Sequence, residues 1–146
     1  INLEPKNPVG YTCRGFAYSY LSQSEAAFAD FNRAIELAPN DPNAYFERGS
    51  AYYQHNDPDR AIADFSQVIK LNPQFADAYY FRGLNYTYKK PVDALAANLD
   101  FSQAIKLDPT QVRYYDARGR LRNDSKDYQG AIADYNQALK LDPNFA

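Results

Sequence analysis

Apolar and polar residues alternate along this chain with the spacing of short amphipathic helices. After the dipeptide Asp41-Pro42, the residues Tyr45, Gly49 and Tyr52 recur at i, i+4 and i+7, which predicts an apolar stripe along a helix. The glycine at the centre of the stripe lets a neighbouring helix approach closely. Aspartate is a favoured N-cap and proline is favoured at the first helical position, so the dipeptide predicts where this helix begins.

A second helix is predicted after the polar turn at 54–56. Asp57 and Pro58 repeat the aspartate–proline start, and Pro73 ends the segment. Its apolar positions have helical spacing and are Ala61, Ile62, Phe65, Val68, Ile69 and Leu71. Two helices of about 14 residues, joined by a few polar residues, predict an antiparallel pair. Such a pair is shorter than the roughly 40 residues below which a domain usually needs outside help, so it must stack on a neighbour.

The same two-helix pattern recurs four times. Each copy has an arginine–glycine dipeptide in its first helix, and the four glycines, Gly15, Gly49, Gly83 and Gly119, are spaced 34, 34 and 36 residues apart. Each second helix has an alanine followed four residues later by an aromatic residue. This period is typical of repeat proteins whose units stack on each other. We therefore predict a single domain over 1–146, with units at about 8–41, 42–75, 76–111 and 112–145, and with 1–7 as the end of a preceding repeat.

The recurring positions Tyr45, Gly49, Tyr52, Ala61, Phe65 and Pro73, in a 34-residue period, resemble the tetratricopeptide repeat. The resemblance covers nearly the whole chain. It implies an all-α fold, a right-handed α-solenoid of antiparallel helix pairs in which the first helix of each pair lines a concave groove. It also implies a scaffold for protein–protein interaction. Because both ends match interior positions of the repeat, we expect an internal fragment of a longer array.

The third unit departs from the pattern, because Gly83 to Ala97 is two residues longer than Gly49 to Ala61. If Pro91 is aligned with Pro58, the turn loses one residue and the second helix gains three at its start. Three residues are nearly one helical turn, so the apolar face would stay roughly in phase.

Composition and candidate chemistry narrow the function. A net charge of −2 argues against a general nucleic-acid binder, and no apolar run reaches the length of a membrane span. The one histidine, His55, lies in a polar turn without a cluster of metal ligands around it. The one cysteine, Cys13, cannot form an internal disulfide, and we interpret it as a small, half-buried residue rather than a nucleophile. We predict no enzyme activity, no catalytic residues, no metal and no cofactor; the compartment stays open, with the cytoplasm favoured.

Two charged positions recur in every unit, one arginine in the first helix and one aspartate in the second. Residues that meet a partner should differ between units, whereas residues that build the unit should recur. We therefore predict structural ion pairs, within a unit or across a junction, with the geometry that guanidinium and carboxylate groups favour. The residues are Arg14, Arg48, Arg82, Arg118, Asp30, Asp64, Asp100 and Asp134.

A second stripe on the first helices varies between units, as a binding surface should. By the resemblance it faces the groove, where we predict partner-binding residues. They are Thr12, Phe16, Ser19, Tyr20, Asn43, Phe46, Glu47, Ser50, Tyr53, Gln54, Asp77, Tyr80, Leu84, Thr87, Tyr88, Arg113, Asp116, Arg120 and Asn123. The stripe is aromatic in the first three units and charged in the fourth. Aromatic faces bind apolar or cationic side chains, so a bound peptide is one interpretation. In the other, the aromatic residues only pack against each other.

Some family members grip a C-terminal carboxylate with cationic side chains in this groove. In this chain the equivalent positions, which we call columns of the repeat, hold Thr12, Phe16, Glu47, Asp77 and Phe81. None of these residues is a cation, so we do not expect the chain to bind a C-terminal carboxylate in this way.

Two further hypotheses concern partners. Copies could stack head to tail, with Phe145-Ala146 receiving Ile1 to Leu3 of another copy. Alternatively, the chain is an auxiliary repeat segment of a larger enzyme or of a secretion or assembly protein whose activity lies elsewhere. The identity of the partner is left open, and we expect no nucleic acid and no membrane span.

Overall fold

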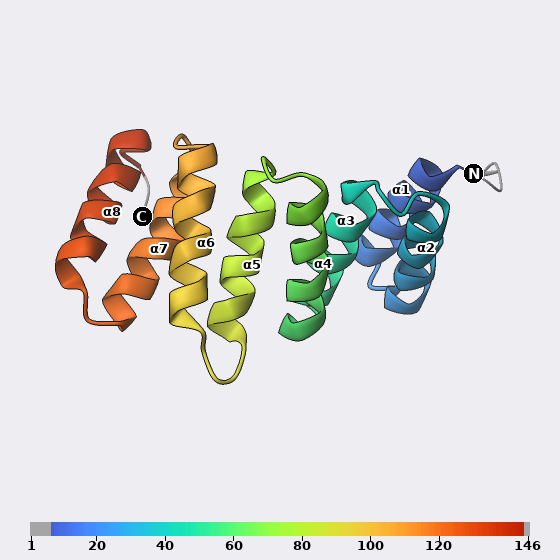
Figure 1. Ribbon diagram of the computed structural model, residues 1–146, viewed down its shortest axis with the longest axis horizontal. Coiled ribbons are helices and arrows are strands. Elements are labelled where there is room, and N and C mark those ends of the chain that lie inside the picture. Colours follow the sequence, from blue (N-terminus) through green and yellow to red (C-terminus); the bar gives the residue numbers. More distant parts are fainter. Residues whose placement is uncertain (1–6, 145–146) are drawn as a thin grey trace. The chain divides into compact units, whose positions relative to one another are not determined.

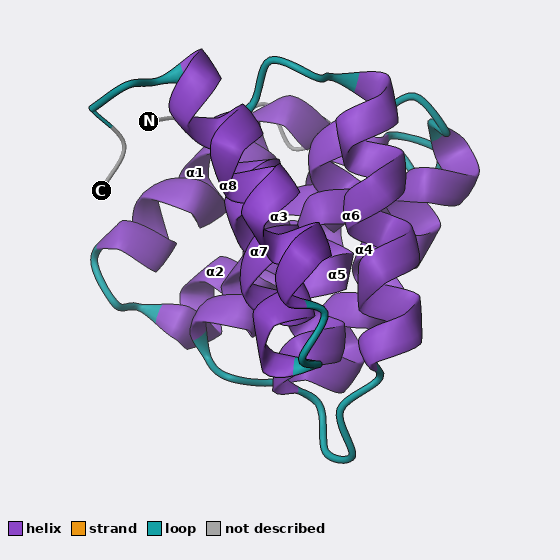
Figure 2. Ribbon diagram, turned by 90° about the vertical axis from the view of Figure 1, so that its left-hand side faces the viewer, coloured by secondary structure: helices purple, strands orange, loops and turns teal. Residues whose placement is uncertain are grey.

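The computed structural model describes residues 7–144, which form eight α-helices joined by short loops and contain no strand (Figures 1 and 2). The helices are α1 (Pro8–Tyr20), α2 (Ser24–Leu37), α3 (Pro42–Gln54), α4 (Pro58–Leu71), α5 (Ala76–Tyr88), α6 (Ala94–Leu107), α7 (Val112–Asp124) and α8 (Tyr128–Leu141). Each of the four predicted units contains one helix pair. Among the described residues, no helix has the length and apolar character needed to cross a membrane.

Short polar side chains start five of these helices. Asn7, Asp41, Asp57, Asp93 and Asp127 each accept a hydrogen bond from a backbone N–H of the first turn, at 3.0–3.3 Å. These bonds satisfy N–H groups that have no partner inside the helix. Proline is at the first position of α1, α3 and α4. The aspartate–proline signal in the sequence therefore places the helix starts correctly.

The chain divides into two compact units, Ile1–Pro73 and Gln74–Ala146. In the first unit, α1 packs on α2 and α3 packs on α4, while α3 also contacts α1 and α2. In the second unit, α5 packs on α6 and α7 packs on α8, and α7 contacts α5 and α6. Each compact unit is thus two antiparallel helix pairs, and the first helix of the later pair contacts both helices of the earlier pair.

The recurring glycine and aromatic residue form the closest contact inside a pair. Phe31 of α2 is 1% exposed and lies directly against α1 at Gly15. A Cβ atom at Gly15 would be 2.7 Å from Cε1 of Phe31, and one at Gly119 would be 2.8 Å from Cε1 of Tyr135. No side chain fits at these distances, so the glycine allows the two helices to approach and the aromatic ring to be buried.

The prediction of a longer second helix in the third unit is wrong. Helix α6 has 14 residues, as α2, α4 and α8 do, and the two additional residues lie in the loop between α5 and α6. Asp93 is the N-cap of α6 and accepts a hydrogen bond from Ala96, so Asp93 rather than Pro91 occupies the start of the helix. The Lys90–Pro91 peptide bond in this loop is cis. In both views the loop extends beyond the ends of the helices (Figures 1 and 2).

The prediction of a half-buried Cys13 is also wrong, because Cys13 is exposed. It precedes Gly15 by two residues, about 200° around the helix, so it lies nearly opposite the face of α1 that packs on α2.

Candidate functional site

The predicted partner-binding residues lie on two surfaces, one in each compact unit. We define the α1–α3 face as Thr12, Phe16, Ser19, Tyr20, Asn43, Phe46, Glu47, Ser50, Tyr53 and Gln54. We define the α5–α7 face as Asp77, Tyr80, Leu84, Thr87, Tyr88, Arg113, Asp116, Arg120 and Asn123. Each of these residues is at least partly exposed. The large side chains most open to solvent on the α1–α3 face are Phe16, which is 44% exposed, and Tyr20, which is 76% exposed.

The recurring arginines and aspartates lie between the two helices of each pair and not on these faces. Each arginine donates two hydrogen bonds to the carboxylate of its aspartate, at 2.6–3.0 Å. The pairs are Arg14–Asp30, Arg48–Asp64, Arg82–Asp100 and Arg118–Asp134. Each ion pair joins the two helices of a single repeat unit, so none of the four crosses a junction between units. The hydrogen bond to the aspartate raises the pKa of Arg14, Arg48 and Arg82, whereas burial raises the pKa of Asp100 against the opposing effect of Arg82.

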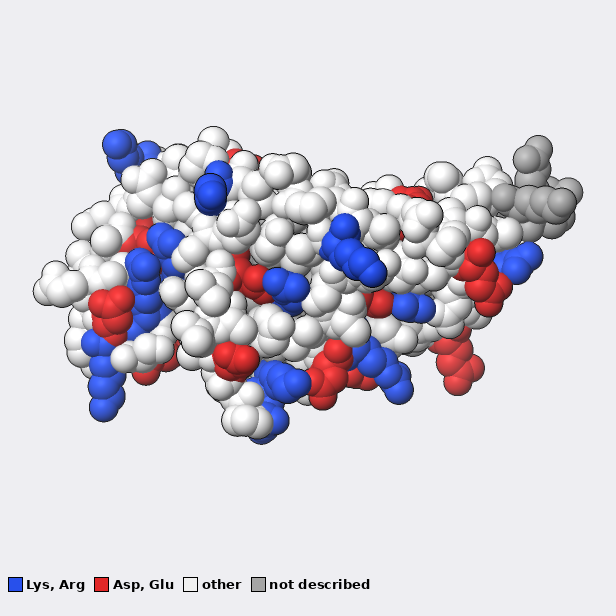
Figure 3. All heavy atoms as spheres, in the orientation of Figure 1, with Lys and Arg blue, Asp and Glu red and all other residues white. Residues whose placement is uncertain are grey.

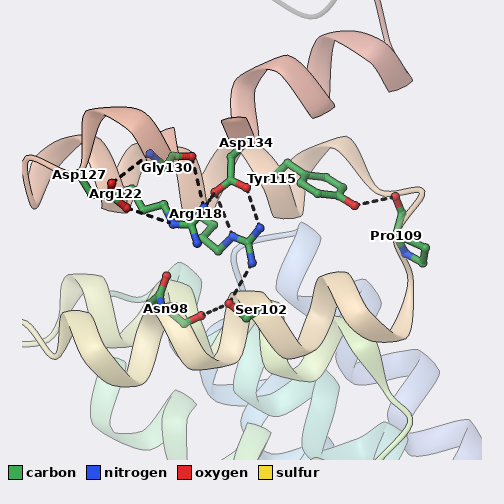
Figure 4. A network of polar contacts seen from close by, with 9 residues as sticks. All are labelled: Asn98, Ser102, Pro109, Tyr115, Arg118, Arg122, Asp127, Gly130 and Asp134. Atoms are coloured by element: carbon green, nitrogen blue, oxygen red, sulfur yellow. Dashed lines mark hydrogen bonds and ion pairs between the residues drawn. The ribbon is translucent and has the colours of Figure 1, made fainter. Parts of the chain in front are cut away.

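The fourth pair is part of a larger network (Figure 4). Asp134 accepts a third hydrogen bond, at 2.8 Å, from Arg122, which also donates to the carbonyl of Gly130 at 3.3 Å. Arg118 also donates to the hydroxyl of Ser102 on α6 at 3.0 Å. Arg122 is at the position that tyrosine occupies in the other three repeat units, as Tyr18, Tyr52 and Tyr86. In the fourth repeat unit, a second cation therefore replaces an aromatic ring beside the buried carboxylate.

A hollow of about 220 Å³ lies beside Arg122 in the second compact unit. Its lining residues are Ala94, Asn98, Leu121, Arg122, Ser125 and Asp127. In the first compact unit, the positions equivalent to Asn98, Arg122 and Ser125 hold Phe28, Tyr52 and His55. The ring of Phe28 stacks on that of Tyr52, with centroids 4.6 Å apart. Because the guanidinium of Arg122 already bonds to Asp134 and Gly130, the hollow offers a ligand no uncommitted cation, and we assign it none.

The α5–α7 face is closed by its own side chains. Asp77 accepts hydrogen bonds from the guanidinium of Arg113, at 2.6 Å, and from the hydroxyl of Tyr114. The guanidinium of Arg113 lies 5.3 Å from the ring centroid of Tyr80 and 5.4 Å from that of Tyr114. Arg120 donates to Asp116 at 3.0 Å. The charged residues predicted to meet a partner here are therefore paired with each other.

Tyr114 is a residue of this cluster that our sequence analysis missed. It is 1% exposed, in a column that holds Gly10, Ala44 and Ala78 in the other units. Its ring lies 5.1 Å from that of Tyr80, centroid to centroid, and burial together with the bond to Asp77 raises the pKa of its hydroxyl. One large residue in a column of small ones was the signal in the sequence.

The α1–α3 face is more open. The rings of Phe16 and Tyr20 meet edge to face, with centroids 4.8 Å apart. The hydroxyls of Thr12, Ser19 and Ser50 donate to carbonyls of their own helix at 2.9–3.2 Å, so they have one interaction already. This face presents rings and one carboxylate, Glu47, rather than paired charges.

The other sequence candidate for metal or base chemistry is His55. His55 is exposed at the C-cap of α3 and shares a hydrogen bond of 2.7 Å between its Nε2 and the hydroxyl of Ser24. Within residues 7–144, no group of three histidine, cysteine or acidic residues is arranged to hold a metal ion. Basic and acidic side chains lie next to one another at several places on the face shown in Figure 3, most of which is formed by other residues.

Two sequence profiles, both described as tetratricopeptide repeat, match residues 16–83 and 112–145. The chain belongs to the tetratricopeptide repeat family. The fold is accordingly an all-α tetratricopeptide solenoid, a class that typically serves as a protein–protein interaction scaffold without catalytic activity. None of the curated proteins compared with the chain matches it.

Solved structures share this tetratricopeptide fold. A crystal structure of MamA is similar with a TM-score of 0.87 and 24% identity, over 96% of this chain and 81% of that one. The first tetratricopeptide domain of Spaghetti (RPAP3), bound to the HSP90 peptide SRMEEVD, has a TM-score of 0.78 and 17% identity, over 86% of this chain and 98% of that one. The tetratricopeptide domain of Arabidopsis OM64 has a TM-score of 0.67 and 28% identity, over 71% of this chain and 84% of that one.

Proposed function

We propose that this tetratricopeptide domain binds an extended segment of a partner protein on its α1–α3 face. The observation that carries the proposal is the pair of exposed aromatic rings, Phe16 and Tyr20, on first helices whose recurring polar residues are already used inside the fold. Aromatic rings that are partly open to solvent are typical anchors for a bound peptide, since they bury a large area at a small cost in side-chain entropy.

The second unit supports binding less well. On the α5–α7 face, Asp77, Arg113 and Tyr114 are bonded to each other, and Asp116 is bonded to Arg120. A partner that used these groups would have to break interactions that the domain makes by itself. The α1–α3 face presents no such ion pair within the described residues, so a partner can be received there without that cost.

The RPAP3 domain, bound to an HSP90 peptide, supports peptide binding as a use of this fold. That structure does not imply that this chain binds the same peptide. The α1–α3 face has no cation among its residues and one carboxylate, whereas SRMEEVD carries acidic side chains. We therefore expect this chain to select a different sequence.

A selection experiment tests the proposal. A displayed library of random twelve-residue peptides is selected on the immobilised chain, and the enriched peptides are measured against two variants. Phe16→Asp places a charge on the α1–α3 face, and Leu99→Asp places the same charge on α6, where Leu99 is 61% exposed. We expect enriched peptides to lose at least tenfold in affinity for Phe16→Asp and to keep their affinity for Leu99→Asp. Peptides that respond only to Leu99→Asp would contradict the proposal.

A second candidate function is self-association through α8. Tyr128, Ile132 and Leu139 on this helix are 57%, 53% and 45% exposed. In the first unit the column of Ile132 holds Phe28, which is covered by Tyr52 of the next helix pair. We propose that α8 receives a helix pair of a second copy in the same way; the end residues predicted for this contact, Ile1 to Leu3 and Phe145-Ala146, lie outside the described residues.

Sedimentation velocity over a hundredfold range of concentration tests this stacking. We expect the mass to grow with concentration in the natural chain and to stay monomeric in Ile132→Asp. A monomer at every concentration in the natural chain would contradict the hypothesis.

A further inference from the structure

One carboxylate on the α1–α3 face lacks a counter-charge. Helices α1 and α3 carry three charged residues, Arg14, Arg48 and Glu47. Both arginines are bonded to aspartates of their own helix pairs. For Glu47, the part of the chain that the structure describes provides neither an ion pair nor a hydrogen bond to the carboxylate. Glu47 is half-buried, and the loss of water around it raises its pKa.

The corresponding positions of the repeat predict that Glu47 lies near Phe16. Columns correspond between the two compact units, so Phe16 matches Leu84, and Glu47 matches Ala117. In the second compact unit, Leu84 of α5 and Ala117 of α7 pack against the same buried cluster of α6 and α7 residues. Because α1 contacts α3 as α5 contacts α7, the correspondence between the compact units predicts that Phe16 and Glu47 lie near each other in the first one.

We propose that the α1–α3 face recognises a cationic side chain, lysine or arginine, in the bound segment. This inference rests on the proposed function and specifies its ligand. The cation pairs with the carboxylate of Glu47, while its methylene groups lie on the ring of Phe16. A cation over an aromatic ring is attracted by the negative face of the ring, and a charge-assisted hydrogen bond to a carboxylate is stronger than a neutral one.

The comparison between the two units supports this assignment. On the α5–α7 face the carboxylate of Asp77 already has a cation, Arg113, which lies over the rings of Tyr80 and Tyr114. The second compact unit thus shows, from its own residues, a carboxylate paired with a cation that lies over aromatic rings. The equivalent positions of Asp77 and Arg113 in the first compact unit hold Val9 and Asn43, so the comparison illustrates the chemistry and not the position of the site. On the α1–α3 face, a lysine or arginine of the partner would supply the cation for Glu47.

Titration of the ¹⁵N-labelled chain with short peptides, followed by amide chemical shifts, tests the inference. The probes are acetyl-Ala-Ala-Lys-Ala-Ala-amide and the same peptide with norleucine, which has nearly the same shape without the charge, in place of lysine. The protein is the natural chain, Glu47→Gln and a matched control, Glu25→Gln. Glu25 is exposed in the first turn of α2, so its variant has the same change in net charge away from the face.

We expect the lysine peptide to shift amides of α1 and α3, and to bind roughly fivefold more tightly than the norleucine peptide. Glu47→Gln should abolish this preference and Glu25→Gln should keep it. Equal binding of the two peptides on the face would overturn the inference and leave the proposed function intact. An equal loss in both variants would also overturn it, since it would indicate long-range attraction. If neither peptide shifts these amides, the inference is overturned, and the peptide selection decides separately whether the face binds peptides at all.

Discussion

Replacing Asp134 with alanine should be among the most destabilising single changes in this chain. The carboxylate of Asp134 accepts two hydrogen bonds from Arg118 and one from Arg122, at 2.7–3.0 Å. Its side chain is 4% exposed, and that of Arg118 is 16% exposed. The variant therefore leaves two guanidinium groups in a mostly buried place without their counter-charge.

The magnitude follows from that burial. Removing one partner of a buried ion pair costs about 3–5 kcal/mol of stability, mostly because the remaining charge is left uncompensated. Against the about 5–15 kcal/mol that stabilises a typical domain, this is a large part. Glu36→Ala removes one partner of an exposed pair, Arg33–Glu36, whose side chains are 47% and 64% exposed. That variant should cost less than about 1 kcal/mol.

Urea unfolding followed by circular dichroism measures both variants. Arg122→Ala gives an intermediate point, because it removes one of the three hydrogen bonds and should cost about 1.5–3 kcal/mol. This variant also keeps the test informative if Asp134→Ala does not fold. Equal unfolding free energies for Asp134→Ala, Arg122→Ala and Glu36→Ala would refute a structural role for the recurring aspartate.

Three further predictions concern other parts of the molecule. Phe31→Ala should lower the free energy of unfolding by about 3–5 kcal/mol, because Phe31 is 1% exposed and packs against Gly15. Phe16→Ala should lower it by less than about 1 kcal/mol, and similar losses for both variants in urea unfolding would show that the two faces of α1 are assigned wrongly. Tyr114→Phe should cost about 1.5–3 kcal/mol, since it removes the hydroxyl that donates to Asp77, and a thermal melt unchanged from the natural chain would contradict this. Burial raises the pKa of Glu47, so the folded chain holds this proton more tightly than the unfolded chain and the free energy of unfolding falls as the pH rises through that pKa. Glu47→Gln should therefore be more stable than the natural chain at pH 7, and the gain should disappear at about pH 3, below both pKa values; a gain that is the same at both pH values would exclude burial of the charge as its cause.

The recurring residues made most of the fold predictable from the sequence. Asp41 and Asp57 mark helix starts because a short carboxylate satisfies free backbone N–H groups, whatever the rest of the chain does. The glycine and aromatic columns identify the contact inside each pair, since a Cβ atom there would overlap the ring of Phe31 or Tyr135. The recurring arginines and aspartates likewise meet in all four pairs.

Features that occur in only one of the four repeat units were harder to predict. In the third unit, Pro91 suggested a helix start, but Asp93 takes the N-cap and the insertion becomes a loop, because a cap depends on local hydrogen bonding that alignment by proline ignores. Tyr114 stands in a column of small residues, and its contact with Asp77, 37 residues away in the chain, depends on how two helices pack. Whether Glu47 is paired could not be read from the sequence, since that depends on which neighbours approach it in space.

The measurement that tests the central claim most directly is a map of where a selected peptide binds. The peptide with the highest affinity from the library selection is titrated into the ¹⁵N-labelled chain, and the amide shifts are assigned to helices. The account predicts that the largest shifts lie on α1 and α3, around Phe16, Tyr20 and Glu47, and that Phe16→Asp removes them. Shifts confined to α6 and its preceding loop, unchanged by Phe16→Asp, would contradict it.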